Sequence, residues 1–357
     1  MKLAASAALF MAGVVAARGP HGIQHDRIPN DRGTVSRAPR NCMACHPAQA
    51  QLHPATSMAH ALESVSECTI LRTHSVLTFS TGKYAYRIER KADQSIYSVS
   101  DGEQTFSAPI AWAFGLGAAG QTYVFKRNGD LYQTRVSYYQ AIDGLDLTIG
   151  AANRKPTNLA EAAGQLMDRD EKLACFGCHA TDAVRARELT LDTMTPGVQC
   201  ERCHGATENH LKGIKTGDAK LAKMTRLGAL STEQISNFCG QCHRTWEEIA
   251  AAGKLGIADI RFQPYRLTNS KCYDTDDVRI SCLACHDPHR EVDRIEGHYD
   301  AKCQSCHGGG KPNAVACKVA TRGCVGCHMP KLDLPGSHHR FTDHQIRIVR
   351  LNEPYPN

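Results

Sequence analysis

The segment from Cys175 to His328 contains six copies of the pattern Cys-x-x-Cys-His, and the first copy reads CFGCH at residues 175–179. The other five lie at 200–204, 239–243, 282–286, 303–307 and 324–328, and a seventh stands upstream at 42–46. Two thiols three residues apart on one turn can each form a thioether with the same haem, and the adjacent imidazole can then bind its iron. The pattern is therefore typical of covalent haem attachment.

Seven copies predict seven covalently attached haem c groups. The expected attachment residues are the motif cysteines Cys42, Cys45, Cys175, Cys178, Cys200, Cys203, Cys239, Cys242, Cys282, Cys285, Cys303, Cys306, Cys324 and Cys327. The expected proximal iron ligands are His46, His179, His204, His243, His286, His307 and His328. The alternative is tetrahedral zinc held by pairs of Cys-x-x-Cys units, but zinc gives no reason for a histidine directly after every second cysteine.

The composition predicts an unusual core. Only 6% of the residues are aromatic and the mean hydropathy is −0.38. We therefore expect porphyrins to supply much of the apolar filling and thioethers to cross-link the chain, as disulfides do in small scaffolds. The predicted fold of residues 151–357 is a six-haem domain of short helices and irregular loops. The formal charge of +6 is scattered rather than concentrated in runs, so nucleic acid is not an expected partner.

Residues 1–17 have the pattern of a secretory signal peptide. Lys2 is followed by an apolar run from Leu3 to Ala17, with small residues suited to cleavage before Arg18. The run is too short and too rich in alanine for a comfortable membrane span, although an uncleaved anchor is the alternative. No later segment is apolar enough to cross a bilayer. We therefore predict a periplasmic or extracellular protein without a transmembrane segment after cleavage.

Residues 75–150 predict an inserted antiparallel β domain without an attachment motif. Tyr84, Tyr86 and Ile88 alternate with polar residues, which is strand periodicity. Further strands are expected at 95–100, 121–126 and 131–139, and Asn128-Gly129 between the last two is a hairpin signal. A G-x-G-x-x-G pattern at 115–120 precedes a predicted strand, whereas a dinucleotide site requires a helix there, so nucleotide binding is rejected.

Residues 18–74 are predicted to form an N-terminal arm and the first haem site. His60, on an expected short helical stretch, is the preferred second iron ligand of this region, and Met58 is the alternative. His21 and His25 in the arm are interpreted as solvated. Two further helices are predicted: one capped at Thr157-Asn158 and running to Met167, and one opened by a Ser231/Gln234 capping box and running through Cys242.

With these motifs placed, the chain resembles the multihaem c-type cytochromes of the class that includes the tetrahaem cytochromes of nitrification and the relatives of hydroxylamine oxidoreductase. Three blocks carry the resemblance: GVQCERCHG at 197–205 followed by His210, the motif at 282–286 followed by Asp287-Pro288-His289, and CVGCHMPK at 324–331 followed by His338 and FTDH at 341–344. The chain departs from the enzymes of this class, because it has no Cys-x-x-Cys-Lys and no evident tyrosine cross-link motif.

The resemblance implies that histidines trailing a motif ligate a different haem from the one beside them. It therefore implies His210, His289 and His344 as distal ligands, with His338 as a less secure match because His339 adjoins it. His60 and His298 complete the set of expected second ligands. His289 follows His286 across Asp287-Pro288, so it cannot fold back across the same porphyrin and must ligate a neighbour or stay free.

Three functions follow as hypotheses. The first is extracytoplasmic electron transfer through a chain of seven haems, with redox partner proteins. The second is an oxidoreductase that acts on a small nitrogen or sulfur compound at one open iron. The third is a subunit of a larger respiratory, filamentous or membrane-bound cytochrome assembly. Cys68, Cys272 and Cys317 lie outside the motifs. In an exported protein two of the three are expected to pair, and Cys272 with Cys317 is preferred because both lie in the haem domain; buried or free thiols are the alternative.

Overall fold

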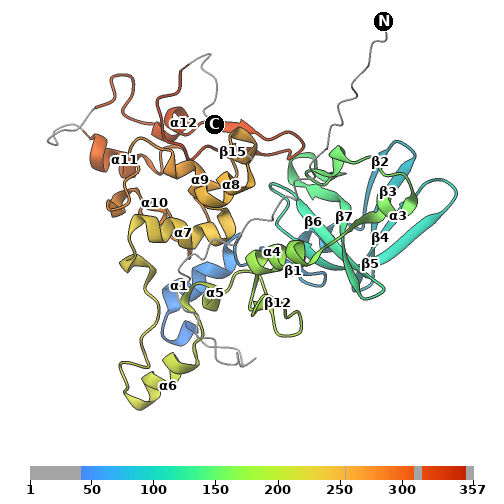
Figure 1. The fold of residues 1–357 in the computed structure, drawn as a ribbon, viewed down its shortest axis with the longest axis horizontal. Helices are drawn as coiled ribbons and strands as arrows, with labels where there is room; N and C mark the ends of the chain where they lie inside the picture. The colour runs from blue at the N-terminus through green and yellow to red at the C-terminus, as the bar shows by residue number, and fades with distance from the viewer. Residues whose placement is uncertain (1–41, 254, 309–315, 351–357) are drawn as a thin grey trace, which may run out of the picture. The chain divides into compact units, whose positions relative to one another are not determined.

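The computed structural model describes residues 42–253, 255–308 and 316–350, and its described part combines a large antiparallel sheet with many short helices (Figure 1). No described helix is both long enough and apolar enough to cross a membrane. The predicted signal peptide, His21 and His25 lie outside the described residues.

The antiparallel sheet has nine strands, coloured from blue to green in Figure 1. Its main path follows the chain in a meander: β2 Val76–Thr81, β3 Tyr84–Lys91, β4 Gln94–Ser100, β5 Thr105–Phe114, β6 Gln121–Arg127, β7 Asp130–Tyr139 and β8 Gly144–Leu147. Two short strands join from outside the predicted span of 75–150: β1 (Leu62–Ser64) pairs with β5, and β9 (Gly164–Leu166) pairs with β7.

The strand predictions are confirmed at the level of single side chains. Tyr84, Tyr86 and Ile88 are buried on β3, while Ala85 and Arg87 between them are exposed. The turn from β6 to β7 contains Asn128 and Gly129 with φ of 52° and 87°, as the predicted hairpin requires. Strand β6 starts directly after Gly120, so the glycine pattern at 115–120 leads into a strand rather than a helix.

Both faces of the sheet bury apolar side chains. One core cluster includes Tyr86, Tyr97 and Phe125 and is covered by α3 (Leu159–Ala163), whose Ala163 carbonyl accepts a 2.8 Å hydrogen bond from the Tyr97 hydroxyl. A second cluster joins Phe114 of β5 to Phe176 of α4 (Arg169–His179). Phe176 lies inside the second attachment motif, so the sheet and that motif share one core.

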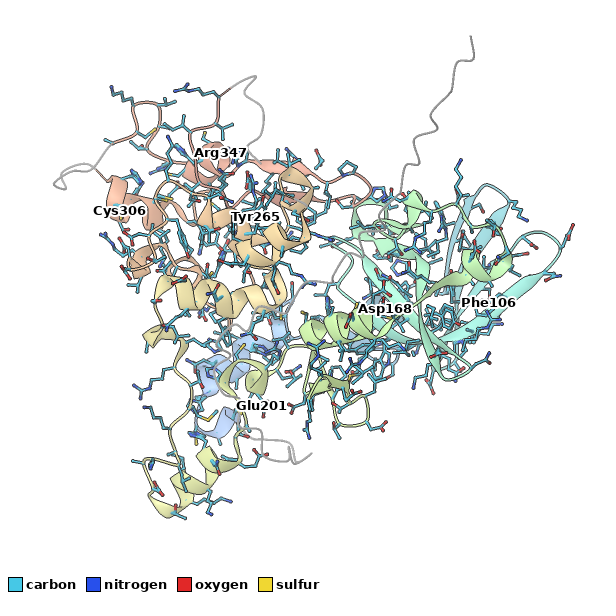
Figure 2. All side chains as sticks on the ribbon, in the orientation of Figure 1. Phe106, Asp168, Glu201, Tyr265, Cys306 and Arg347 are labelled. Carbon is cyan, nitrogen blue, oxygen red and sulfur yellow. The ribbon has the colours of Figure 1, made fainter. Side chains whose placement is uncertain are left out.

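The predicted helix from Thr157 to Met167 is partly wrong. Asn158 does cap a helix, since its side chain accepts a hydrogen bond from the Glu161 amide, but that helix ends at Ala163. Gly164 then enters β9 and pairs with β7, so close to it that a Cβ atom would lie 2.3 Å from the Gln133 carbonyl oxygen. A separate helix, α4, starts after a capping box of Asp168 and Glu171 and carries the second motif (Figure 2 labels Asp168).

The helical stretch expected around Met58 to Leu62 is also wrong. Helix α1 (Pro47–Leu52) and the 3₁₀ turn η2 (His53–Ala55) end before it. The Thr56 side chain caps the turn at this point, since its hydroxyl donates to the His53 carbonyl and accepts from the Ala59 amide. His60 therefore lies in a turn, and Leu62 starts β1.

The rest of the described chain is short helices and loops, as predicted. The Ser231/Gln234 capping box is present and opens α7 (Thr232–His243). The other helices are η1 Cys42–Ala44, α2 Thr69–Thr73, η3 Gln140–Ile142, η4 Ala151–Asn153, α5 Cys200–His204, α6 Glu208–Thr216, η5 Leu227–Ala229, α8 Trp246–Ala252, η6 Ile257–Asp259, α9 Gln263–Thr268, η7 Val278–Ile280, α10 Cys282–Cys285, α11 Asp300–His307 and α12 Cys324–His328. Three two-stranded pairs accompany them: β10 Ala180–Thr181 with β13 Thr195–Pro196, β11 Val184–Arg185 with β12 Glu188–Leu189, and β14 Lys331–Asp333 with β15 Arg340–Thr342.

Candidate haem-binding sites

Every attachment motif lies in or at the end of a helical turn. Helices α5 and α12 consist of the motif alone, and α4, α7 and α11 end at the motif histidine. In α10 and η1 the helical turn covers the first residues of the motif, and the histidine follows it. Residues three apart lie on the same face of a helical turn, so each motif presents its two thiols to one side. This is the arrangement that two thioethers to one haem require.

Three of the proximal histidines face a second imidazole. The ring centres of His46 and His210 lie 6.4 Å apart. Those of His204 and His289 lie 6.1 Å apart, with the rings nearly parallel at 8°. Those of His286 and His344 lie 6.4 Å apart.

This separation suits two imidazoles on opposite sides of one metal ion. A metal–imidazole bond is about 2 Å long and the ring centre lies about 1 Å beyond the bonded nitrogen, so two such ligands place their ring centres about 6 Å apart. The described residues contain no group of three or more His, Cys, Asp or Glu side chains that could hold a metal ion. Pairs of histidines are consistent with haem iron, because the porphyrin occupies the other coordination positions of the iron.

In each pair, the second histidine follows a motif other than that of its partner. His210 follows the third motif but faces His46 of the first. His289 follows the fifth motif and faces His204 of the third, and His344 follows the seventh motif and faces His286 of the fifth. The structure thus brings His210, His289 and His344, the trailing histidines of the three family-like blocks, to proximal histidines of other motifs.

The hydrogen bonds of six histidines favour the tautomer that binds iron through Nε2. In each of them Nδ1 lies within 2.6–3.3 Å of an oxygen that can only accept a hydrogen bond. Among the proximal histidines, His179 faces the Ala61 carbonyl, His204 the Thr225 carbonyl and His328 the Arg347 carbonyl. Among the trailing histidines, His210 faces the Ala222 carbonyl, His344 the Thr342 carbonyl and His289 the Asp287 carboxylate. Nδ1 therefore carries the proton, and the lone pair of Nε2 is left for a metal.

Burial reinforces the neutral form of several of these rings. Burial lowers the pKa of His344 to about 4, and it also lowers the pKa values of His179, His243 and His286. A neutral imidazole is the form that ligates a metal. These histidines are therefore ready to bind iron at neutral pH.

The other predicted second ligands have different surroundings. Both ring nitrogens of His60 face acceptors, with Nδ1 3.1 Å from Glu63 Oε1 and Nε2 2.7 Å from the Pro54 carbonyl, so neither presents a lone pair. His298 contacts Asp293 at 3.1 Å and the ring of Tyr299. His338 Nε2 lies 2.7 Å from Asp146 of the sheet.

Three proximal histidines, His179, His243 and His328, have no second imidazole at the spacing of the three pairs among the described residues. The ring beside His179 is Phe114, at 5.4 Å between centres. Their second ligands remain a prediction.

Contacts between cysteines give the order of the motifs in space. The side chains of Cys42 and Cys200, of Cys178 and Cys242, of Cys239 and Cys282, and of Cys303 and Cys324 lie close to each other. Cys203 also interacts with Cys242, and Cys285 with Cys303. The first motif therefore adjoins the third, and the third to seventh motifs follow one another. The second motif lies beside the fourth.

The three cysteines outside the motifs are free thiols, so the predicted disulfide between Cys272 and Cys317 is wrong. Cys272 lies near the motif cysteines Cys285, Cys303 and Cys306, whereas Cys317 is exposed on a different segment. Cys68 is fully buried in the sheet core and donates to Gln121 Oε1 at 3.1 Å, and burial raises the pKa of its thiol to about 11.

Sequence reasoning missed a buried ion pair next to His344, a predicted iron ligand. Arg266 of α9 binds Asp343, the residue before His344, and neither side chain is exposed. A salt bridge between residues 77 positions apart leaves no periodic signal in the sequence. The one available signal was an acidic residue directly beside a predicted ligand.

Comparison with known proteins supports haem binding. A family model described as "Cytochrome c554 and c-prime" matches residues 140–205, which include the second and third motifs. The multiheme cytochrome MtrA of Shewanella baltica (strain OS185) is 26% identical over 164 residues, which cover 44% of this chain and 40% of that protein. These matches support a multihaem c-type cytochrome. The chain thus spans well under half the length of this relative, and no solved structure matches it.

Proposed function

We propose that this protein is an extracytoplasmic electron-transfer protein that holds seven haem c groups. The observation that carries the proposal is the set of three imidazole pairs, each 6.1–6.4 Å between ring centres. An iron with two imidazole ligands has no position left for a substrate, so such a site suits electron transfer rather than catalysis. When bound, haem iron supplies a reversible one-electron couple.

The side chains of this chain have three tasks in that function. The motif cysteines anchor each group on a short helix. Carbonyls such as those of Ala61 and Ala222 accept the Nδ1 protons, which fixes the ring planes and the tautomers. Histidines that follow one motif complete the site of another, so the same residues that complete each site also fix the spacing between motifs.

The spatial order of the motifs suggests a route for electrons between the haem sites. The sequence of contacts from the first motif through the third, fourth, fifth, sixth and seventh would form one continuous path, with the second as a branch beside the fourth. The sheet packs on the second motif through Phe114 and Phe176 and would keep water from that branch. Redox proteins at either end of the path are the expected partners.

The proposed location is the periplasm or the cell exterior, reached through the signal peptide at residues 1–17. The resemblance to a multiheme cytochrome supports the electron-transfer role, and association with a larger or membrane-bound cytochrome complex is part of this proposal.

A second candidate function is an oxidoreductase of a small nitrogen or sulfur compound. The observation that favours it is the environment of His179, where the neighbouring ring is Phe114, which has no ligating atom. An iron held by His179 alone would keep one position open.

Spectra of the oxidised protein test the two functions against each other. Electron paramagnetic resonance and absorption should show only low-spin, six-coordinate haem, and the reduced protein should bind no carbon monoxide. Stoichiometric binding of carbon monoxide at one haem would favour the oxidoreductase. The absence of any low-spin haem would overturn electron transfer through bis-imidazole sites.

A further inference from the structure

We propose that the buried ion pair of Arg266 and Asp343 is a positioning device for two haem-binding histidines, His344 and His328. The inference rests on the proposed function and adds residues that no attachment motif contains. It assigns to one short segment, residues 343–347, the orientation of ligands at the fifth and the seventh motif.

The ion pair has a fixed geometry. Arg266 Nε lies 2.9 Å from Asp343 Oδ1, and Nη2 lies 3.0 Å from Oδ2, so the guanidinium holds both carboxylate oxygens. Both side chains are 0% exposed. A bidentate arginine–carboxylate pair sets the orientation as well as the distance of the carboxylate, because the two hydrogen bonds are parallel. Arg266 also donates to the side chain of Gln345 at 2.8 Å.

The backbone around His344 is held from the same side. Asp343 Oδ1 accepts a hydrogen bond from the Gln345 amide at 3.0 Å. The hydroxyl of Ser270, just beyond α9, donates to the His344 carbonyl at 3.1 Å and accepts from the Ile346 amide at 2.8 Å. His344 is thus fixed before and after its own position, with its ring facing His286.

The same segment continues to the seventh motif. The Arg347 guanidinium binds the Asp343 carboxylate. The Arg347 carbonyl accepts the Nδ1 proton of His328 at 2.9 Å, and the Arg347 amide donates to the His328 carbonyl at 3.2 Å. Figure 2 labels Arg347 and Tyr265, the residue before Arg266. One carboxylate therefore connects the distal ligand of one site to the proximal ligand of another.

Stability alone does not account for such a pair. Replacing a buried ion pair with apolar residues of similar size is often neutral or stabilising, because both charges lose their hydration on burial. The pair does have a directional effect, because its two parallel hydrogen bonds fix the orientation of the Asp343 carboxylate in the loop that holds His344. Positioning can therefore be separated from stability by experiment.

The main test is the double variant Arg266→Met/Asp343→Leu, studied as the haem-loaded protein. Removing the charges of Arg266 and Asp343 together avoids leaving either of these two buried without its partner, while Arg347 keeps its 2.9 Å hydrogen bond to the Gln345 carbonyl. We expect unchanged haem content by mass and a melting temperature close to that of the unmutated protein. We also expect one haem to change from low-spin to high-spin and to bind one additional equivalent of carbon monoxide. The midpoint potential of a second haem should shift, because the Nδ1 hydrogen bond of His328 is lost.

Two single variants complete the test. Arg266→Lys keeps the charge but cannot form the two parallel bonds, so we expect full haem content with altered low-spin resonance signals at one haem. Arg169→Met is the control, because Arg169 forms an exposed ion pair with Glu188 on the surface at 2.8 Å. It should leave the spectra, the potentials and the haem content unchanged.

Each outcome decides the proposal. Unchanged spectra and potentials in the double variant would overturn it, and so would the loss of covalent haem from both Arg266 variants, which would show that the pair is required for folding instead. If the unmutated protein lacks low-spin haem, the proposed function fails. If low-spin haem is present but insensitive to these variants, only the positioning role fails.

Discussion

At the scale of single residues, the decisive feature is which nitrogen of each imidazole is free. The Nδ1 of His289 donates to Asp287 at 3.0 Å and its ring faces His204, whereas both nitrogens of His74 are engaged, by the Ile70 carbonyl at 2.8 Å and Asp143 at 3.1 Å. Of these two residues, only His289 has a ring nitrogen whose lone pair is free to bind iron. A count of histidines in the sequence cannot make this distinction.

His289→Ala should convert one low-spin haem to high-spin without the loss of any covalent haem. The reason is that the variant removes the ring facing His204 and leaves all attachment cysteines in place. Electron paramagnetic resonance, mass measurement and carbon monoxide binding of the reduced protein check it.

The matched control is His74→Ala, which removes an imidazole between α2 and β2, where both ring nitrogens already face oxygen acceptors. It should leave every haem spectrum unchanged. A His289 variant with a spectrum like that of the His74 variant would show that His289 is not a ligand.

At the scale of elements, close backbone approaches decide where helices end. Strand β9 starts at Gly164 because the chain passes β7 with no room for a side chain. The periodic apolar residues up to Met167 indicate a longer helix, and sheet pairing overrides that local preference.

Gly164→Ala should lower the free energy of unfolding by about 1–3 kcal/mol, as overpacking does in well-packed regions. Its Cβ atom would lie 2.3 Å from the Gln133 carbonyl oxygen. Thermal unfolding followed by the far-ultraviolet circular dichroism of the sheet measures the change. Gly228→Ala is the control, because nothing lies within 4 Å of a Cβ atom there, and equal stability of the two variants would contradict the steric explanation.

At the scale of the whole molecule, the sheet and the chain of motifs are joined at the second motif. Phe114 and Phe176 share a core, and the Ala61 carbonyl just before β1 accepts the Nδ1 proton of His179 at 2.8 Å. The sheet therefore supports one site directly and carries no attachment motif of its own.

Deletion of residues 75–149 should leave most haem spectra intact and change the spectrum of the group attached at Cys175 and Cys178. The deletion removes Phe114 but none of the motif cysteines. Peptide mapping of covalent haem and absorption spectra check this result. Loss of haem from every motif would show that the sheet is required for the folding of the entire chain.

The mature protein should have the mass of the chain from about Arg18 plus seven haems. The physical reason is that each motif provides both thioether positions and an iron ligand. Intact-protein mass spectrometry under denaturing conditions measures it, since covalent haem survives unfolding. A mass that fits bound zinc without haem would contradict the whole assignment.

The sequence by itself determined the covalent chemistry and the local structure. Seven motifs specify the cofactor, alternation at Tyr84, Tyr86 and Ile88 specifies a strand, and Ser231 with Gln234 specifies a helix start, because each of these patterns depends on residues a few positions apart. Only the tertiary structure decided that His289 faces His204, that the third motif adjoins the first, that Gly164 ends a helix, and that Arg266 reaches Asp343. These contacts join segments distant in sequence, and they follow from packing and from hydrogen-bond partners that no local pattern encodes.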